Sequence, residues 1–315
     1  MNILKALVKR EILDGKNGYL RVPVVLAGIT VALLALSALG FGNMIEFHGM
    51  EGGTMHREGI ENLGDAVTRL HEKEPENAPA AIAVGYWGMS ALAWMAFPFV
   101  VFFSLLGALY EERRDKSILF WKSMPVADWQ EVAVKLFVPV IVAPLVFLGV
   151  TIAAQIIIAF FLSVVVLFEG GPVLVMWPLG YMMGSWLAGI SMYLIYAMWA
   201  LPVFAWILLV SAFSNRMPFM WAVLLPGVAI AMENLFLDTN VVGSWIGMHV
   251  GGWMEFAFAG HHKDINGPRD LLVELLGGPQ LEALGYSVTS LHFWAGLVVA
   301  GGIVYATIEK RKRAI

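Results

Sequence analysis

The chain has 315 residues, of which 59% are hydrophobic and 14% charged, and its mean hydropathy is +0.74. Soluble domains are about 45–50% apolar and about 25% charged, so this composition excludes an ordinary soluble domain and indicates a polytopic membrane protein. The formal net charge of −4 says little by itself, because the charges are sorted along the chain. Cysteine is absent, which excludes disulfides, thiolate nucleophiles and cysteine metal sites.

The first residues have the pattern of an amphipathic helix. Apolar side chains recur at helical spacing on one face: Ile3, Leu4, Leu7, Val8 and Ile12. Charged side chains are expected to face away from it: Lys5, Lys9, Arg10 and Asp14. Gly15 and Gly18 interrupt the pattern. We therefore expect residues 1–18 to lie along the inner membrane surface.

Six stretches are apolar and long enough to cross a bilayer, which takes about 20 helical residues. The predicted spans are residues 22–42, 84–110, 132–168, 184–213, 219–237 and 288–308. The first is too long for a signal-peptide core and has no clear cleavage site, so it is expected to remain as a span. The sequence thus predicts an all-α protein in which residues 1–315 form one transmembrane domain.

The third predicted span is too long for one straight crossing. At about 1.5 Å per residue it would measure about 55 Å. It must protrude beyond the bilayer or bend, and Pro139 and Pro144 are the expected hinges. Asp128 is predicted to be its N-cap, with Glu131 as the capping partner.

Basic residues are concentrated in alternate connections. With the N-terminus inside, the outer segments hold only five of the 20 basic residues: Arg57, Arg69, Lys73, Lys263 and Arg269. The positive-inside rule then places both termini and the connection after the second span in the cytoplasm. Residues 43–83 and 238–287 are expected to be extracytoplasmic, with a surface helix over Ile60–Lys73.

A charged passage, residues 110–131, separates the second predicted span from the third. Within it, residues 118–121 (Ile-Leu-Phe-Trp) form one apolar turn, and Pro125 ends the pattern. A loop that only joins two spans does not need such a turn, so one interpretation is a plug for a groove on a partner protein. The other interpretation is an interfacial turn that lies on lipid headgroups.

Motifs for several chemistries are missing. The sequence has no phosphate-binding glycine-rich loop that ends in Lys-Ser or Lys-Thr, and so is not expected to hydrolyse nucleotide itself. It also lacks a His-Glu-x-x-His pair and a Gly-x-Ser-x-Gly elbow, and no catalytic residue is expected. His261, His262 and Asp264 include metal-ligand types, but adjacent histidines point in different directions on regular structure, so a solvated loop is favoured.

Two polar residues inside the predicted spans are candidates for a translocation path. Glu233 is in the outer half of the fifth span, where a carboxylate must face water, a partner or a cavity. It could equally be an interface carboxylate near the helix end, and Gln155 is a weaker candidate of the same kind. No acidic or histidine relay crosses the bilayer, which disfavours a proton-coupled transporter and indicates an energy source outside this chain.

The topology and one motif together resemble the permease subunits of the ABC type-2 exporter class. The motif is E-R-x-x-x-S-I-L-F-x-K-S-x-P, and its residues here run from Glu112 to Pro125, with Lys135 at the next helix. The resemblance in topology covers nearly the whole chain, whereas the motif covers only a short stretch. The extracytoplasmic segment 43–83 is larger than the short loop of many members.

This resemblance implies a cytoplasmic coupling helix at about residues 115–124, which docks in a groove of a separate ATPase subunit. The coupling residues would be Glu111, Glu112, Arg113, Arg114, Ser117, Ile118, Leu119, Phe120, Trp121, Lys122 and Pro125. Among them, residues 118–121 would supply the apolar contact and residues 111–114 a polar hinge. Residues 1–18 would be the connecting helix, and 241–259 and 269–284 re-entrant or surface helices.

The implied function is the transmembrane subunit of an ATP-binding cassette exporter in the bacterial cytoplasmic (inner) membrane. It would pair with a second permease chain, identical or related, and contact membrane lipid; no nucleic-acid partner is expected. ATP and Mg²⁺ would be bound by the partner ATPase, with no cofactor or metal in this chain. The alternative is a non-transporting scaffold or regulatory subunit that docks a partner through residues 111–131. A secondary transporter and an intramembrane enzyme fit less well.

Overall fold

The computed structural model describes residues 3–38, 62–257, 267–276 and 278–313. Helices account for the regular structure of these residues, and no strand occurs among them. The first half contains α1 (Ile3–Asp14), η1 (Asn17–Arg21), α2 (Val22–Ala38), α3 (Leu63–Lys73), α4 (Ala78–Ala108), α5 (Tyr110–Arg114), α6 (Ile118–Lys122), α7 (Asp128–Phe137), η3 (Val138–Val142) and α8 (Ala143–Phe168). The second half contains η4 (Val173–Met176), α9 (Leu179–Trp199), α10 (Leu201–Phe213), α11 (Pro218–Leu237), α12 (Val241–Gly247), η5 (Met248–Gly252), α13 (Trp253–Ala257), α14 (Pro268–Leu276), α15 (Pro279–Thr289) and α16 (Leu291–Lys312).

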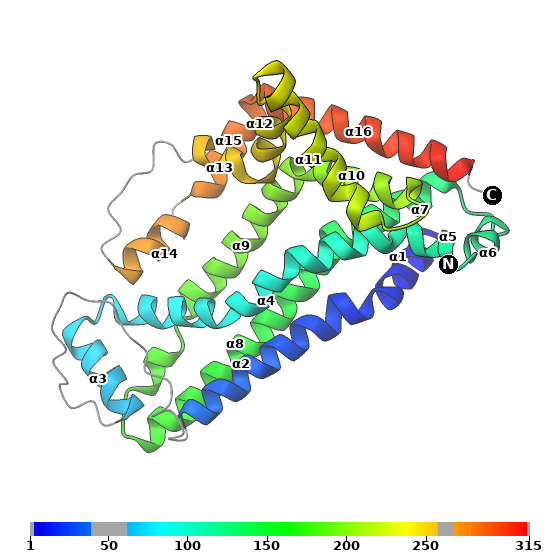
Figure 1. Cartoon of the computed structure of the whole chain (residues 1–315). Helices are drawn as coiled ribbons and strands as arrows, with labels where there is room; N and C mark the ends of the chain where they lie inside the picture. The colour runs from blue at the N-terminus through cyan, green and yellow to red at the C-terminus, as the bar shows by residue number, and fades with distance from the viewer. Residues whose placement is uncertain (1–2, 39–61, 258–266, 277, 314–315) are drawn as a thin grey trace.

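Within the described ranges, six helical stretches are long and apolar enough to span a membrane. They are Asn17–Ser37, Ala78–Arg114, Asp128–Phe168, Val173–Trp199, Pro218–Leu237 and Leu291–Lys312. The all-α class and six apolar helices of spanning length are therefore confirmed, and they fit a multi-pass membrane protein. In Figure 1 the two marked chain ends lie on the same side as α5 and α6, whereas α3 lies at the opposite end.

The long third stretch is interrupted where the prolines predicted it. Residues 138–142 form a π-helical turn that contains Pro139, and α8 resumes with Pro144 in its first turn. A proline has no N–H to donate to the preceding turn, so the helical register shifts there. The predicted cap is wrong by one residue: Ala127 is the N-cap of α7, and its N–H donates to Gln130 Oε1. Asp128 is drawn instead towards a guanidinium on α16.

The predicted fourth span, residues 184–213, corresponds to two helices. α9 begins earlier, at Leu179, and ends at Trp199; α10 follows after Ala200. Pro202 lies in the first turn of α10, where a missing N–H is tolerated, but it cannot donate back into α9. With 13 residues, α10 is shorter than the six stretches of spanning length.

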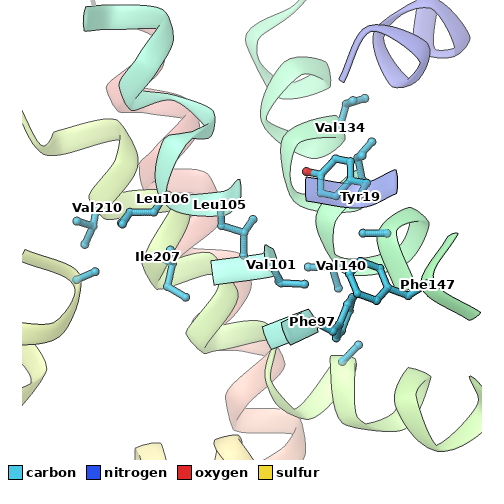
Figure 2. Close-up of a cluster of buried hydrophobic side chains, with 14 of the residues drawn as sticks. Tyr19, Phe97, Val101, Leu105, Leu106, Val134, Val140, Phe147, Ile207 and Val210 are labelled. Atoms are coloured by element: carbon cyan, nitrogen blue, oxygen red, sulfur yellow. The ribbon is translucent and has the colours of Figure 1, made fainter. Parts of the chain in front are cut away.

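The main apolar core forms between η1, α4, η3, α8, α9 and α10 (Figure 2). Its centre is aromatic: the Phe97 and Phe147 rings meet edge-on with centroids 5.0 Å apart, and Tyr193 approaches Phe97 at 5.5 Å. Val101 and Leu105, one and two turns after Phe97, extend the core along α4. The helices are thus fixed to one another at the end that also bears the charged passage.

The segments predicted to be extracytoplasmic are helical where they are described. Gly64 at the start of α3 donates its N–H to Glu169 Oε2 (2.6 Å), and Val67 is buried against Val166 and Met176. Residues 39–61, which include the end of the first predicted span and the first part of the predicted outer segment 43–83, lie outside the described residues, as do His261, His262 and Asp264. The predicted piece 241–259 overlaps α12, η5 and α13. The predicted piece 269–284 overlaps α14 and α15.

A second aromatic cluster joins these later helices to α9 and α16. The rings of Trp199 and Trp253 stack at 5.5 Å between centroids, and Trp199 Nε1 donates to Ser287 Oγ (2.7 Å). His249 is buried beside Trp199, and its Nδ1 lies 2.8 Å from the carbonyl oxygen of Trp245. This cluster anchors η5 and α15 to the bundle.

Candidate functional site

The charged passage begins where α4 gives way to α5, and it is fixed there to the end of α10. Ser211 Oγ accepts hydrogen bonds from the N–H groups of Leu109 and Tyr110, both at 3.0 Å. Arg113 donates to the carbonyl oxygens of Ser211 (2.5 Å) and Ser214 (2.8 Å). These are carbonyls that the last turn of a helix leaves without a partner, so Arg113 caps α10 and joins it to α5.

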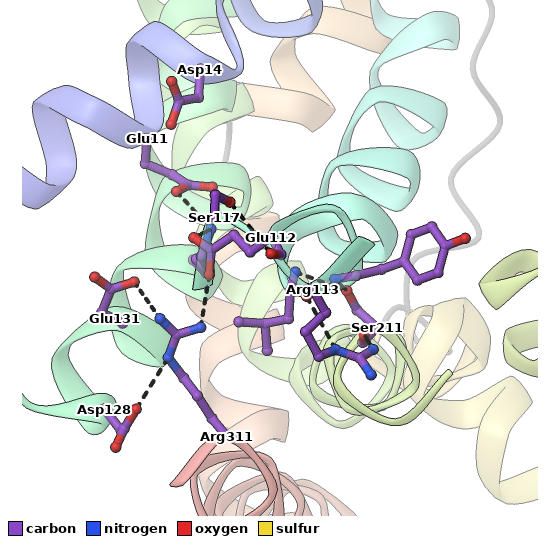
Figure 3. A network of polar contacts seen from close by, with 12 residues as sticks. Glu11, Asp14, Glu112, Arg113, Ser117, Asp128, Glu131, Ser211 and Arg311 are labelled. Atoms are coloured by element: carbon purple, nitrogen blue, oxygen red, sulfur yellow. Dashed lines mark hydrogen bonds and ion pairs between the residues drawn. The ribbon is translucent and has the colours of Figure 1, made fainter. Parts of the chain in front are cut away.

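Glu112 is buried at the centre of an ion-pair network (Figure 3). Its two carboxylate oxygens lie 3.0 Å from Lys135 Nζ and 2.8 Å from Arg311 Nη1, and Arg10 approaches at 3.4 Å. Glu131 is also buried and pairs with Arg311 Nη2 (2.9 Å) and Arg10 Nη1 (3.2 Å). Four elements, α1, α5, α7 and α16, therefore converge on these two carboxylates.

Three further carboxylates belong to the network. Glu11 of α1 lies 3.1 Å from Lys135 Nζ, and Asp128 lies 3.3 Å from Arg311 Nε. Asp14 also lies 3.8 Å from Arg10 Nε, so three cations face five carboxylates in a region where Glu11, Glu112, Glu131, Lys135 and Arg311 are all buried. Desolvation makes such a network costly to form and more costly to break, because removing one member leaves a buried charge without its partner.

Arg10 connects the network to the apolar turn. Its guanidinium carbon lies 3.9 Å from the centroid of the Trp121 ring, within the range of a cation–π interaction. Burial lowers the pKa of Arg10, but the neighbouring carboxylates, Glu131 first, outweigh this and raise its pKa above the ordinary value. Arg10 is among the charged residues predicted to face away from the apolar side of the first helix, and its side chain is only 14% exposed because it points towards these carboxylates. The carboxylates of α5 and α7 attract it inward.

The four apolar side chains of α6 divide into two pairs. Ile118 is buried, and Trp121 is partly covered beneath Arg10. Leu119 and Phe120 point outward, with 57% and 58% of their surface exposed. Phe120 meets Trp121 edge-on at 5.0 Å between ring centroids. The turn therefore presents two apolar side chains to an outside surface, while the other two fix it to the protein.

The remaining predicted coupling residues lie around this turn. Lys122 Nζ donates to the carbonyl oxygen of Lys312 (2.9 Å), which links α6 to the last turn of α16. Ser117 Oγ lies 3.4 Å from the carbonyl oxygen of Glu112. Glu111, Arg114 and Pro125 are exposed, and Arg114 pairs with its neighbour Asp115 at 3.0 Å. The passage thus combines a fixed inner face with an exposed outer face.

A cavity of about 560 Å³ borders the network between the α1–η1 segment and the end of α4. Its lining includes the apolar side chains of Phe99 and Phe103 and the carboxylates of Asp14, Glu111 and Asp115. Beside the cavity, Tyr19 of η1 hydrogen-bonds to Ser104 of α4. The cavity separates η1 from the end of α4 beside the ion pairs.

Gln155 and Glu233, the two candidates for a translocation path, both have internal partners. Gln155 is buried between α4, α8 and α9: it donates to Ser90 Oγ (2.9 Å) and accepts from Trp186 Nε1 (2.7 Å). Glu233 accepts from the N–H groups of Val241 (2.5 Å) and Val242 (2.8 Å), which begin α12. Its carboxylate thereby caps the helix that follows its own span.

Sequence reasoning missed Glu11, Glu131 and Arg311 as members of one cluster. A local signal existed for two of them. Glu11 falls one turn after Leu7 on the buried face of α1, and Glu131 and Lys135 are four residues apart on one face of α7. No pattern in the sequence indicates that Arg311, which lies 180 residues beyond Glu131, joins them.

Comparison of the chain with models of protein families, with curated proteins and with solved structures gives no match. The class of protein established by these observations is therefore a helical, multi-pass membrane protein with six helices of spanning length in its described part.

Proposed function

We propose that this chain is the membrane-spanning subunit of an ATP-driven exporter of the ABC type-2 class, powered by a separate cytoplasmic ATPase that binds ATP and Mg²⁺. The observation that carries the proposal is the division of α6 between two faces. Leu119 and Phe120 are exposed, whereas Ile118 and Trp121 attach the same helical turn to the rest of the chain. A short apolar helix of this kind suits docking into a groove on a partner.

The contacts behind α6 explain how a docked partner would move the spans. Trp121 contacts Arg10 of α1, Lys122 contacts the end of α16, and the preceding α5 is bonded to α10 through Arg113. The network around Glu112 adds α7. A displacement of α6 is therefore transmitted to several spans at once, and nucleotide-driven motion of the ATPase would bias them between inward-open and outward-open states.

The orientation and assembly follow from the same proposal. The end of the bundle that bears α1, α5, α6 and the C-terminal turn of α16 faces the cytoplasm, because the basic residues are concentrated there. α1 lies at the inner membrane surface with Ile3, Leu4 and Leu13 exposed towards lipid. A second permease chain completes the passage, and α12–α15 form the outer re-entrant or surface helices.

The proposal is tested by placing a photo-crosslinking amino acid at Phe120 in the full chain and irradiating membranes. We expect a cross-link to a cytoplasmic polypeptide that is itself labelled by azido-ATP, and we expect Phe120→Asp to abolish co-purification of that polypeptide. Phe168→Asp is the control, since Phe168 is also exposed but ends α8 at the far side of the bundle. Trp121→Asp is less informative, because it also removes the stacking with Arg10.

The side of the membrane on which Phe120 lies can contradict the proposal. The chain has no cysteine, so Phe120→Cys creates a single labelling site. An impermeant maleimide should reach it in inverted vesicles and not in intact cells. Labelling in intact cells would reject the proposal. Partner binding without ATP-dependent transport would favour the scaffold alternative.

A further inference from the structure

The described part of the chain contains a second large cavity, a groove of about 640 Å³ between α10 and α11. Its walls are apolar and aromatic: Trp206, Leu209, Val210, Phe213, Trp221 and Leu225. At one end the tight turn between the two helices contributes Ser214, Asn215 and Arg216. The volume is in the range of small-molecule sites, and the lining is apolar along its length and cationic at one end.

A proline in α11 provides the backbone acceptor that joins the two helices beside the groove. Pro226 inside α11 has no N–H, so the carbonyl oxygen of Ala222, four residues earlier, has no helical partner. Trp206 of α10 donates its Nε1–H to this carbonyl at 3.1 Å. The indole thus satisfies a backbone acceptor that would otherwise be unpaired among apolar side chains, and it holds the two helices together at that level.

The polar end of the groove has a cation that is available to a ligand. Arg216 is exposed, and its guanidinium makes no ion pair with any residue that the structure describes. The turn holds its backbone in place, because Ser214 Oγ donates to the carbonyl oxygen of Arg216 (2.8 Å). A second cation is near: Lys310 Nζ of α16 lies 4.7 Å from the centroid of the Phe213 ring, which lines the groove.

We propose that this groove binds one anionic glycerophospholipid, with its phosphate on Arg216 and an acyl chain along Trp206, Leu209 and Leu225. A basic pocket between membrane helices at the headgroup level favours an anionic head, and the apolar walls in the plane of the span favour an acyl chain. The inference requires only that α11 spans the membrane, and so it stands apart from any transport function.

The test is native mass spectrometry of the purified full chain with dioleoylphosphatidylglycerol or, separately, dioleoylphosphatidylcholine. We expect Arg216→Gln to weaken retention of phosphatidylglycerol about fivefold, since one basic residue near the headgroups is lost. Leu225→Trp, which fills the groove without changing charge, should weaken it as well. Arg21→Gln is the matched control, because Arg21 is an exposed arginine at the start of another span.

Three outcomes would overturn the proposal. The first is equal retention of phosphatidylcholine and phosphatidylglycerol, and the second is an effect of Arg21→Gln as large as that of Arg216→Gln. The third concerns a different occupant. Leu225→Cys introduces the chain's only cysteine, and efficient disulfide-linked dimers in membranes would show that a second copy covers the groove. Unfolding temperatures of the variants verify that each protein is folded.

Discussion

At the scale of single residues, Arg311 shows how strongly the network depends on each member. Its guanidinium meets Glu112, Glu131 and Asp128, which come from two other elements. If Arg311 becomes neutral, the buried Glu112 and Glu131 keep only Arg10 and Lys135 as partners. The loss of folding stability then comes mainly from the desolvated carboxylates that remain without a partner, and less from the ion pair that was removed.

We therefore expect Arg311→Met to lower the free energy of unfolding by about 3–5 kcal/mol, as measured by thermal unfolding of the protein in detergent. Arg313→Met removes an exposed arginine two residues later and should change it by no more than about 0.5 kcal/mol. Equal effects of the two substitutions would contradict the burial and pairing described for Arg311.

Gln155 provides a second residue-scale prediction. Replacing it with Leu leaves Trp186 Nε1 and Ser90 Oγ without their partner between α4, α8 and α9. Interhelical hydrogen bonds in membranes contribute about 0.6–2 kcal/mol, so Gln155→Leu should destabilise the protein by that amount in an unfolding assay.

The double variant Gln155→Leu with Trp186→Phe removes both groups of the 2.7 Å bond and should recover part of the loss. No recovery would show that this bond does not contribute to the stability of the helix contact. A role in a translocation path would instead reduce transport per folded molecule.

At the scale of elements, the contact between η5 and α16 depends on a missing side chain. A Cβ built on Gly296 would overlap Nε2 of His249, a buried residue among the aromatic rings of Trp199 and Trp245. Glycine at this position lets a whole imidazole pack against the α16 backbone. The close approach of η5 to α16 at this position therefore depends on glycine.

Gly296→Ala should push His249 away and lower the unfolding temperature, because a packed interior does not readily accommodate extra volume. Gly301→Ala on the same helix is the control: its added Cβ meets nothing within 4 Å. Alanine favours an unstrained helix over glycine by up to about 1 kcal/mol, so that variant should be neutral or more stable. If Gly301→Ala lowers the unfolding temperature as much as Gly296→Ala does, the effect comes from α16 itself and not from the contact with His249.

The break before α8 was predicted from the sequence, whereas the break after α9 was not and the ends of the spans were predicted only in part. Pro139 and Pro202 mark the interruptions before α8 and after α9, since a missing N–H acts on its own turn of helix. The apolar run 184–213 gave no indication that α9 starts at Leu179, because a Met- and Tyr-containing turn is only moderately apolar. Length and hydropathy identify a span better than they locate its ends.

At the scale of the whole molecule, the number of spanning helices was predictable because each depends on a contiguous apolar run. The site was predictable only in outline. The apolar turn of α6 was visible in the sequence, but the direction of Ile118 and the stacking of Trp121 on Arg10 were not. These contacts join residues about a hundred or more positions apart, and no local periodicity encodes such pairs.

The position of Arg311 near the end of the last helix has a consequence for biogenesis. Glu112 and Glu131 are synthesised and inserted long before Arg311 leaves the ribosome, and until then their carboxylates have only Arg10 and Lys135 as counter-ions. The region around these two carboxylates is therefore expected to stay hydrated until α16 has been synthesised. A chain that stalls before α16 lacks Arg311, so we expect its buried carboxylates to stay open to water and the stalled chain to be degraded faster than the full chain.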